Sequence, residues 1–484
     1  MSGAKPPHDT RSREEMTDQH DTRGYRQTWA EIDLDNLSHN LRAVRARIKK
    51  GVKVMACVKA EAYGHGLIPV SRELVDAGAD FLAVASVDEA VRLRRAGIDS
   101  RILVLGLVRE EDIPALFDHR ITPTVCSFAF AKALSRQAFL RGHGVDIHIK
   151  VDTGMGRIGI MHDQAFGPVR RISALPNIRI EGIFTHLACA DSDDGLTRRQ
   201  IRLFGRLVSR LRKASISIPL VHAANSMGII SYPDSHFTMV RPGLILYGLR
   251  PVKGLPADIR PVMSLKTCVV YVKDVRAGTG VSYGHTYVTR RATRIATLPV
   301  GYGDGYPRSL SNTGPVLING RRFTIAGRVC MDQVMVDVGD ALVRPGDEAV
   351  LIGTQKKRRI SAESLASLSG TIPYEIVCGI NSRVPRVYRK KAALPAEKRR
   401  SERRPEAIPV RFFDTPSLAD TAGVTGDISA AGMKLYTPDP VLPYRTYRMS
   451  LEKRGRDPVR VRGTAVWTRP ADNGMYASGI KFLK

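Results

Sequence analysis

The chain has 484 residues, enough for two or three domains with cores of their own, and no apolar run reaches the roughly 20 residues that a membrane-spanning helix needs. Its six cysteines are scattered without close pairs, which argues against a disulfide framework and a zinc site and fits a reducing cytoplasm. Lys and Arg outnumber Asp and Glu by 75 to 47, a charge balance that suits an anionic small ligand, a membrane surface or a nucleic acid. The sequence has no RNA-binding aromatic signature and no zinc-finger spacing, so nucleic acid is the weakest of these three hypotheses.

The N-terminal part of the chain predicts a disordered extension followed by an α/β domain. Residues 1–26 are charged, contain proline and lack the apolar segment of a secretory signal. Beyond them, eight β-branched strands alternate with amphipathic helices over roughly 220 residues, which predicts a (β/α)8 barrel over residues 27–255. A doubly wound open sheet is the alternative, although no Gly-x-Gly-x-x-Gly motif follows the first strand. The expected strands are residues 54–58, 81–85, 102–107, 122–126, 145–151, 178–185, 220–223 and 238–246.

After the barrel the sequence pattern changes to short strands and turns. Residues 256–388 predict a smaller, mostly β domain, with one helix expected after a Ser361 cap. Residues 389–406 form a Lys/Arg/Glu/Pro run that indicates an exposed linker. Strands at even spacing then predict a small β-barrel domain, which together with part of the linker covers residues 399–484.

Lys59 is the first candidate site residue, because it stands at the end of the first expected strand. A buried lysine loses hydration, and a neutral amine can then form a Schiff base. The competing interpretation is a lysine whose side chain simply reaches solvent. Tyr63, four residues further on, and the Gly64-His65-Gly66 turn favour a site.

Polar residues also follow the other expected strands, where a (β/α)8 barrel carries its chemistry. His148, which alternates with apolar neighbours, is expected instead to be a buried core residue. The polar residues at strand ends are Lys150, Asp152, His186, His222, Asn225, Ser226 and Arg241.

Nine stretches between residues 28 and 388 resemble motifs of the bacterial alanine racemases, in that family's order and spacing. The resemblance implies dependence on pyridoxal phosphate, a (β/α)8 barrel followed by a β domain, and a head-to-tail homodimer with shared active sites. The stretches are VKAEAYGHG, KVDTGMGRIG, THLACAD, NSMG, VRPGLILYG, VSYG, PVGYGDGYPR, GRVCMDQ and SRVPR.

The resemblance also implies a two-base mechanism. Lys59 would hold the cofactor and act as base for D-alanine, and Tyr283 of a second chain would act as base for L-alanine. Arg241 resembles the arginine that faces the pyridine nitrogen and donates a hydrogen bond to it without protonating it. The other cofactor-binding residues that the resemblance implies are Tyr63, His186, Ser226, Gly243 and Leu244.

For the substrate, the resemblance implies that Arg157 and the backbone amide of Met331 hold the carboxylate. Lys150 matches a lysine that is often carbamylated in this family, and as an anion it would fix Arg157. His222 and Asp332 are expected to support the site. No metal is expected.

The chain departs from the family pattern at two positions. Glu61, close to the Schiff-base lysine, replaces an Asn or Asp. Ser382 stands where some members carry a phosphate-contacting tyrosine.

The C-terminal domain resembles PilZ domains, which sense cyclic di-GMP. Arginines suit that ligand because they pair with phosphates and stack on guanines. The competing interpretation of the arginines alone is a solvated linker. The residues that carry the resemblance are Arg399, Arg400, Arg403 and Arg404, then Asp427, Ser429 and Gly432.

We therefore expect a cytoplasmic, homodimeric alanine racemase that supplies D-alanine for peptidoglycan, with a cyclic di-GMP-binding domain and no membrane partner. The alternatives are a racemase of broader specificity, for example for serine, a decarboxylase of the same fold type, and a catalytically silent cofactor- or nucleotide-binding regulator.

Overall fold

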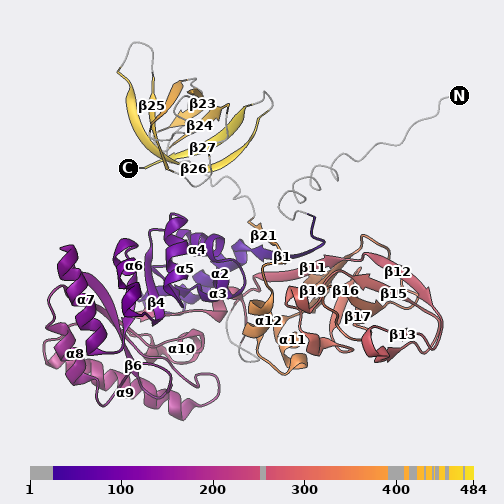
Figure 1. Cartoon of the computed structure of the whole chain (residues 1–484), viewed down its shortest axis with the longest axis horizontal. Coiled ribbons are helices and arrows are strands. Elements are labelled where there is room, and N and C mark those ends of the chain that lie inside the picture. The colour runs from indigo at the N-terminus through magenta and orange to yellow at the C-terminus, as the bar shows by residue number, and fades with distance from the viewer. Residues whose placement is uncertain are drawn as a thin grey trace. The chain divides into compact units, whose positions relative to one another are not determined.

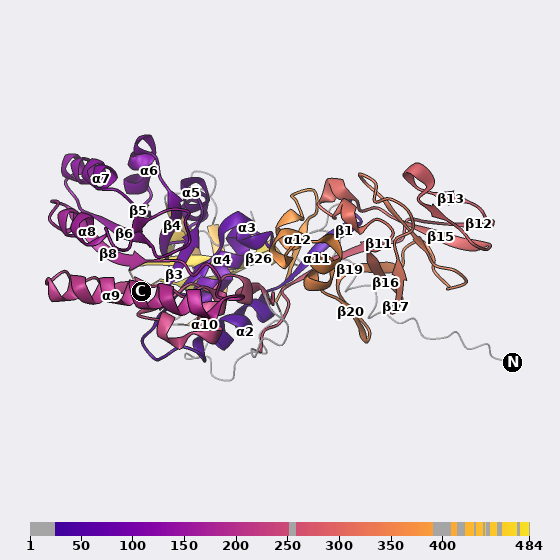
Figure 2. The same cartoon turned by 90° about the horizontal axis from the view of Figure 1, so that it is seen from below.

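The computed structural model describes residues 25–250 and 258–390, and in the C-terminal part residues 408–413, 422–429, 432–438, 441, 446–452, 457–471 and 475–483. The chain divides into two compact units at Lys390 and Lys391. Figures 1 and 2 show the first unit as a strand-and-helix barrel joined to a β domain.

Eight parallel strands form a nearly closed barrel in the order β10-β2-β3-β4-β5-β6-β8-β9, as the sequence pattern predicts. Most of these strands are short and mainly apolar, because helices cover the barrel from outside. The strands are β2 (Lys53–Cys57), β3 (Phe81–Val84), β4 (Arg101–Leu107), β5 (Thr122–Val125), β6 (Val145–Asp152), β8 (Ile178–Phe184), β9 (Leu220–His222) and β10 (Met239–Val240). A short β7 (Ile160–Met161) pairs with β6.

Helices connect these strands around the outside of the barrel (Figure 1). Ser86, Ser127 and Asp193 cap α5, α7 and α9 by accepting hydrogen bonds from backbone amides of the first turn. The helices are α2 (Leu34–Arg45), α4 (Leu67–Asp76), α5 (Val87–Arg95), α6 (Ile113–Asp118), α7 (Phe128–Arg141), α8 (Phe166–Ser173), α9 (Asp194–Lys213) and α10 (Ser226–Ser231).

The last barrel strand is much shorter than predicted. The prediction of one strand over 238–246 is wrong beyond Val240, because Pro242 and Gly243 interrupt the extended chain. A 3-10 turn, η3 (Leu244–Tyr247), follows and lies entirely in the core. This turn brings backbone amides, rather than a strand, to the mouth of the barrel.

The β domain is built on a sheet of order β17-β16-β19-β11-β1-β21. β1 (Thr28–Asp33), from the start of the expected barrel region, pairs with β11 (Met263–Cys268) and β21 (Arg386–Arg389) instead of with a barrel strand. The other strands of this sheet are β16 (Pro315–Ile318), β17 (Arg321–Thr324), β19 (Glu348–Gln355) and its partner β20 (Arg358–Ile360).

Smaller sheets and two helices complete the β domain. Ser361 caps α11 (Ala362–Ser369) as predicted, whereas α12 (Pro373–Gly379) was not predicted. The remaining strands are β12 (Tyr271–Val275), β13 (Gly280–Val281), β14 (Tyr287–Val288), β15 (Thr293–Leu298) and β18 (Val334–Asp337).

The second unit is a closed, six-stranded antiparallel barrel, in agreement with the predicted small β-barrel. Val410, Met433, Leu435, Tyr447 and Met449 lie in its core. β23 was not predicted, because its glycines and Asp interrupt the apolar alternation that marks a strand. The strands are β22 (Pro409–Phe413), β23 (Ala422–Ser429), β24 (Gly432–Thr437), β25 (Thr446–Leu451), β26 (Val459–Pro470) and β27 (Tyr476–Phe482).

Candidate active site

Lys59 follows β2 and opens a left-handed helical turn, α3 (Lys59–Tyr63). Four successive residues without a glycine among them, Ala60, Glu61, Ala62 and Tyr63, have φ between 52° and 55°. Each costs about 1–2 kcal/mol relative to the right-handed form, so the surroundings must hold the turn in place.

Three contacts hold this turn. The Glu89 carboxylate accepts hydrogen bonds from the amides of Ala60 (2.6 Å) and Ala85 (2.7 Å), which tie the turn to the end of β3. Glu61 forms an ion pair with Arg92 of α5. Gly64 ends the turn where any Cβ would lie 2.2 Å from the carbonyl oxygen of Val377.

The turn orients its side chains in opposite directions. Lys59 and Tyr63 line a cavity of about 770 Å³ at the carboxyl ends of the barrel strands. Glu61 is not among the lining residues and reaches Arg92, with about half of its side chain exposed. The hydrogen bond from Arg92, with the Arg92 charge, lowers the pKa of Glu61 against the opposing effect of its partial burial. The carboxylate that departs from the family pattern therefore supports the turn from outside the cavity.

The cavity collects most of the residues that the sequence singled out. Its lining comes from residues 57–244 together with Tyr374 and Cys378 of α12. Among the lining residues are Lys59, Tyr63, Lys150, Arg157, His186, Ser226, Arg241, Gly243 and Leu244.

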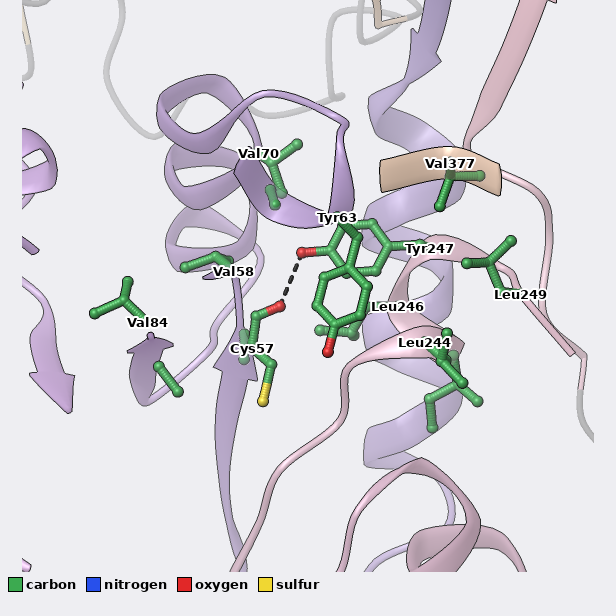
Figure 3. Close-up of a cluster of buried hydrophobic side chains, with 14 of the residues drawn as sticks. Cys57, Val58, Tyr63, Val70, Val84, Leu244, Leu246, Tyr247, Leu249 and Val377 are labelled. Atoms are coloured by element: carbon green, nitrogen blue, oxygen red, sulfur yellow. Dashed lines mark hydrogen bonds between the residues drawn. The ribbon is translucent and has the colours of Figure 1, made fainter. Parts of the chain in front are cut away.

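One wall of the cavity is a cradle of backbone amides and hydroxyls. The Ser226 hydroxyl accepts hydrogen bonds from the amides of Gly243 (3.1 Å) and Ile245 (3.5 Å). The Tyr63 hydroxyl lies so close to Gly243 that a Cβ there would come within 2.6 Å of it. Behind this wall the rings of Tyr63 and Tyr247 lie 4.7 Å apart, and the Tyr247 hydroxyl donates to the Cys57 carbonyl (Figure 3).

Arg241 lies at the base of the cavity and is 3% exposed. Its guanidinium donates to the carbonyls of Thr185 (2.6 Å) and Ala223 (3.0 Å) and to Nδ1 of His222 (2.7 Å). Burial lowers the pKa of Arg241 to about 10, so it stays protonated at neutral pH. Burial, then the Arg241 charge, lowers the pKa of His186, which is therefore neutral beside it.

Lys150 lines the cavity near the end of β6, and Asp152 is the last residue of that strand. The Asp152 carboxylate accepts hydrogen bonds from the amides of Gly154, Met155 and Gly156, at 2.8–2.9 Å, and so organises the turn that carries Arg157. Lys150 is 2% exposed, and its amine donates to the Val151 carbonyl (3.2 Å). Burial, then the Arg241 charge, lowers the pKa of Lys150 to about 7.

Tyr283, Met331 and Asp332 do not line the cavity of their own chain. They lie on the β domain, where Tyr283 is 71% and Met331 is 52% exposed. Backbone hydrogen bonds join the glycine-rich turn at 301–304 to residues 330 and 331, and Arg383 pairs with Asp332 at 2.7 Å. Figures 1 and 2 both show β13, which precedes Tyr283, at the end of the β domain remote from α3.

Three residues correct or extend the set of site residues expected from the sequence. Ser382 is exposed and does not line the cavity, whereas Tyr374 does, with its ring 6.5 Å from that of Tyr63. The sequence pattern predicts no helix over α12, and Tyr374 is therefore absent from the expected site residues. The role of Asp152 was also missed, although the Asp-x-Gly-x-Gly spacing is a signal for a turn of this kind.

In the second unit, Asp427 and Gly432 lie on the adjacent strands β23 and β24, and Ser429 pairs with Gly432 across them. A Cβ at Gly432 would lie 2.2 Å from the Ile480 carbonyl oxygen, so only glycine allows this approach to β27. Arg399, Arg400, Arg403 and Arg404 fall outside the described residues.

Family comparisons match the three domains in turn. Residues 32–251 match the family model described as alanine racemase, N-terminal domain, residues 262–388 match alanine racemase, C-terminal domain, and residues 397–484 match the PilZ domain.

Similar curated proteins cover most of the chain. A protein named alanine racemase from Halothermothrix orenii is 50% identical over 76% of this chain and 98% of its own length. One of the same name from Symbiobacterium thermophilum is 46% identical over 76% of this chain and 98% of its own length.

Solved structures of alanine racemases resemble the fold of this chain over most of its length. An alanine racemase from D-cycloserine-producing Streptomyces lavendulae has a TM-score of 0.72 at 38% identity, over 76% of this chain and 98% of that one. An alanine racemase from Bacillus anthracis, with bound L-Ala-P, has a TM-score of 0.71 at 38% identity, over 76% of this chain and 96% of that one.

Proposed function

We propose that this chain, which belongs to the alanine racemase family of pyridoxal-phosphate-dependent isomerases, interconverts L-alanine and D-alanine with Lys59 and Tyr283 as its two bases. The observation that carries the proposal is the cavity at the barrel mouth. It places the Lys59 amine in one space with a buried guanidinium, Arg241, and with the hydroxyl-and-amide cradle around Ser226 and Gly243.

The donor groups of the cavity fit pyridoxal phosphate. The hydroxyls of Tyr63 and Ser226 and the amides of Gly243 and Leu244 would supply the hydrogen-bond donors that a phosphate needs; in this structure the Gly243 amide donates to the Ser226 hydroxyl. Gly243 leaves a space that a Cβ would fill. Bound at Lys59, the cofactor supplies an electron sink that acidifies the α-hydrogen of an amino acid.

Arg241 would face the pyridine nitrogen. Its pKa of about 10 leaves a guanidinium that donates a hydrogen bond and keeps its own proton at neutral pH. The neutral imidazole of His186 lies 3.5 Å from Arg241 and adds no second charge there. A guanidinium that keeps its own proton would leave that nitrogen unprotonated, which would limit the electron sink and disfavour transamination.

Arg157, assisted by the Met331 amide of a second chain, would bind the substrate carboxylate. Arg157 is exposed at the cavity and has no carboxylate partner among the described residues. Lys150, with a pKa of about 7, has the free amine that reacts with carbon dioxide to give a carbamate and a proton. The resulting anion would pair with Arg157, and Asp332 and His222 would support the site electrostatically.

The location of Tyr283 favours a head-to-tail homodimer. Tyr283 is exposed on the β domain and does not line the cavity of its own chain, so as a base it would have to enter the cavity of a partner chain. In such a dimer each site takes Lys59 from one chain and Tyr283 from the other. Lys59 would then exchange the α-proton on one face of the substrate and Tyr283 on the other.

Mixed dimers test the shared site. Lys59→Ala and Tyr283→Phe chains are each expected to lose racemase activity. When they are co-expressed with different tags and the mixed dimer is isolated, one of its two sites regains both bases. We expect about half of the wild-type kcat, and a mixed dimer as inactive as its parents would refute sharing.

Exchange of the α-proton in D2O tests the reaction itself. Purified protein with pyridoxal phosphate is expected to incorporate deuterium into L-alanine and D-alanine faster than into L-serine or L-lysine. A preference for serine would favour the alternative of a racemase with broader specificity, and no exchange with any of these amino acids would favour the catalytically silent regulator.

We further propose that the chain acts in the cytoplasm and supplies D-alanine for peptidoglycan. D-alanine auxotrophy of a deletion strain that lacks other racemases would support this role.

For the PilZ domain, we propose cyclic di-GMP as the ligand, with Arg399, Arg400, Arg403 and Arg404 as phosphate and guanine partners and Asp427, Ser429 and Gly432 at the strand edge. Calorimetry of the full chain should show binding that is lost in the Arg400→Ala, Arg404→Ala double variant. Unchanged affinity in that variant would refute the pocket. Racemase rates with and without the dinucleotide then decide whether binding regulates catalysis.

A further inference from the structure

The buried charge of Arg241 has no direct counter-ion among the described residues. Within the part of the chain that the structure describes, no carboxylate lies within 4.0 Å of its guanidinium, which instead donates to two carbonyls and to His222. A buried cation without compensation is costly, so a negative charge is expected to act on it from further away.

A hydrogen-bonded chain leads from Arg241 to a carboxylate. Nη1 of Arg241 lies 2.7 Å from Nδ1 of His222, and Nε2 of His222 lies 2.9 Å from Nδ1 of His148. Nε2 of His148 lies 3.3 Å from the carboxylate of Glu181, whose other oxygen pairs with Arg101. The chain thus runs through the barrel interior from the end of β9 to Arg101, the first residue of β4.

The direction of every hydrogen bond in this chain follows from its first member. A guanidinium can only donate, so Nδ1 of His222 must accept and the His222 proton must be on Nε2. That proton is donated to Nδ1 of His148, which places the His148 proton on Nε2, facing Glu181. If Glu181 were protonated and donated to His148, the order would reverse and present an N–H to Arg241.

The charge states of the members agree with this direction. Burial lowers the pKa of His148 and His222, which keeps both imidazoles neutral at pH 7. Burial opposes ionisation of Glu181, but the hydrogen bond from His148 and the charges of Arg101 and Arg179 outweigh it, so the pKa of Glu181 is lowered and the carboxylate is ionised.

The barrel strands leave room for these hydrogen-bonded side chains. His148 and His222 are fully buried, and Glu181 is 2% exposed. A Cβ at residue 182 would lie 2.5 Å from the His148 ring, so Gly182 makes the space for that imidazole. The β6–β8 pairing shifts register by one residue at Glu181, and a bulge of this kind re-aims a side chain.

We propose that Glu181 is a positioning residue for Arg241, whose charge it balances through the two neutral imidazoles of His148 and His222. Its carboxylate fixes both tautomers, and through them the orientation of the guanidinium at the base of the cavity. The consequence for catalysis rests on the proposed racemase function. The assignment of the two tautomers does not depend on that function.

Two substitutions separate charge from hydrogen bonding. Glu181→Gln keeps an oxygen that accepts from His148 but removes the charge, whereas Glu181→Met removes both. Glu73→Met is the matched control. Glu73 is also a buried carboxylate, but it bonds Ser38 and Lys390 and takes no part in the hydrogen bonds between Arg241 and Glu181.

The first measurement records the 15N chemical shifts of the imidazole nitrogens in full-length protein labelled at histidine. The signals of the two residues are assigned with His148→Gln and His222→Gln variants. In the wild type and in Glu181→Gln we expect a proton on Nε2 and none on Nδ1 in both residues. In Glu181→Met we expect mixed tautomers. A proton on Nδ1 of either residue in the wild type overturns the proposal, whether or not the protein has racemase activity.

The second measurement is steady-state kinetics of the loaded enzyme. We expect Glu181→Gln to lower kcat about tenfold and Glu181→Met to lower it further, while KM for alanine changes less than about threefold, because Arg241 does not bind the substrate carboxylate. Glu73→Met should retain wild-type kcat. Wild-type kcat in Glu181→Gln would overturn the role of the charge, whereas an inactive wild type would refute only the proposed function.

Discussion

Substitution of Lys150 by Met should stabilise the protein when the lysine carries no carbamate. Lys150 is 2% exposed, and among the described residues its amine donates to the Val151 carbonyl and lies 5.3 Å from the centre of the Phe184 ring. Burial, then the Arg241 charge, lowers its pKa from 10.5 to about 7. At 1.36 kcal/mol per pKa unit this corresponds to about 5 kcal/mol as an upper bound, and relaxation around the amine brings the expected gain to about 2–5 kcal/mol at pH 7. Methionine has a similar volume and needs no hydrogen-bond partner.

The sign of the pH dependence follows from linkage. Between the folded pKa of about 7 and the unfolded value of 10.5, the unfolded chain binds a proton that the folded chain does not. The advantage of Lys150→Met is therefore complete at or below about pH 7 and disappears above about pH 10.5. Bicarbonate should narrow the difference, because a carbamate at Lys150 gains Arg157 and Arg241 as cationic neighbours.

Urea unfolding followed by tryptophan fluorescence can measure this difference in the first unit alone. The chain has two tryptophans, Trp29 in β1 and Trp467 in the second unit, so a Trp467→Phe background leaves one reporter. Lys132→Met, at an exposed lysine of α7, is the control and should leave stability unchanged. If Lys150→Met were no more stable than the wild type at about pH 7 without bicarbonate, the burial argument would be refuted.

Three further predictions concern residues that hold the turns next to the cavity. Gly64→Ala should lower the free energy of unfolding by more than about 2 kcal/mol, because its Cβ would lie 2.2 Å from the Val377 carbonyl oxygen and its φ is left-handed; a loss near zero in urea unfolding would contradict this. Asp152→Asn should raise KM for alanine more than it lowers kcat, since it weakens the amide contacts that order the turn before Arg157; equal effects on both constants would argue against this role. Glu61→Asn should cost less than about 1 kcal/mol and leave kcat near the wild-type value, because the ion pair with Arg92 is half exposed and outside the cavity; a large loss of kcat would place Glu61 in the chemistry after all.

Much of the candidate site was predictable because barrel chemistry follows strand ends. Lys59, His186, Ser226 and Arg241 each come within four residues after a barrel strand, and Lys150 lies near the end of β6. Parallel strands in a barrel bring their carboxyl ends together. The small β-barrel was predictable for a similar reason, since alternating apolar residues recur along most of its strands.

The orientation of Glu61 could not be predicted from the sequence. A carboxylate two residues after Lys59 looks close to the chemistry, but the left-handed turn directs it to Arg92 on the next helix. A left-handed turn without glycine has no local sequence signal, because it exists only where tertiary contacts with Glu89 and Val377 over-determine it.

By itself the sequence determined the barrel, the β domain, the C-terminal β-barrel and the residue types at the cavity, because hydrophobic periodicity and strand-end motifs are local properties. Only the tertiary structure decided that Tyr283 lies apart from the cavity of its own chain, and that His148 joins Arg241 to Glu181 rather than simply filling the core. Both depend on contacts between distant strands, and the second also on a one-residue bulge in β8 that no local pattern specifies.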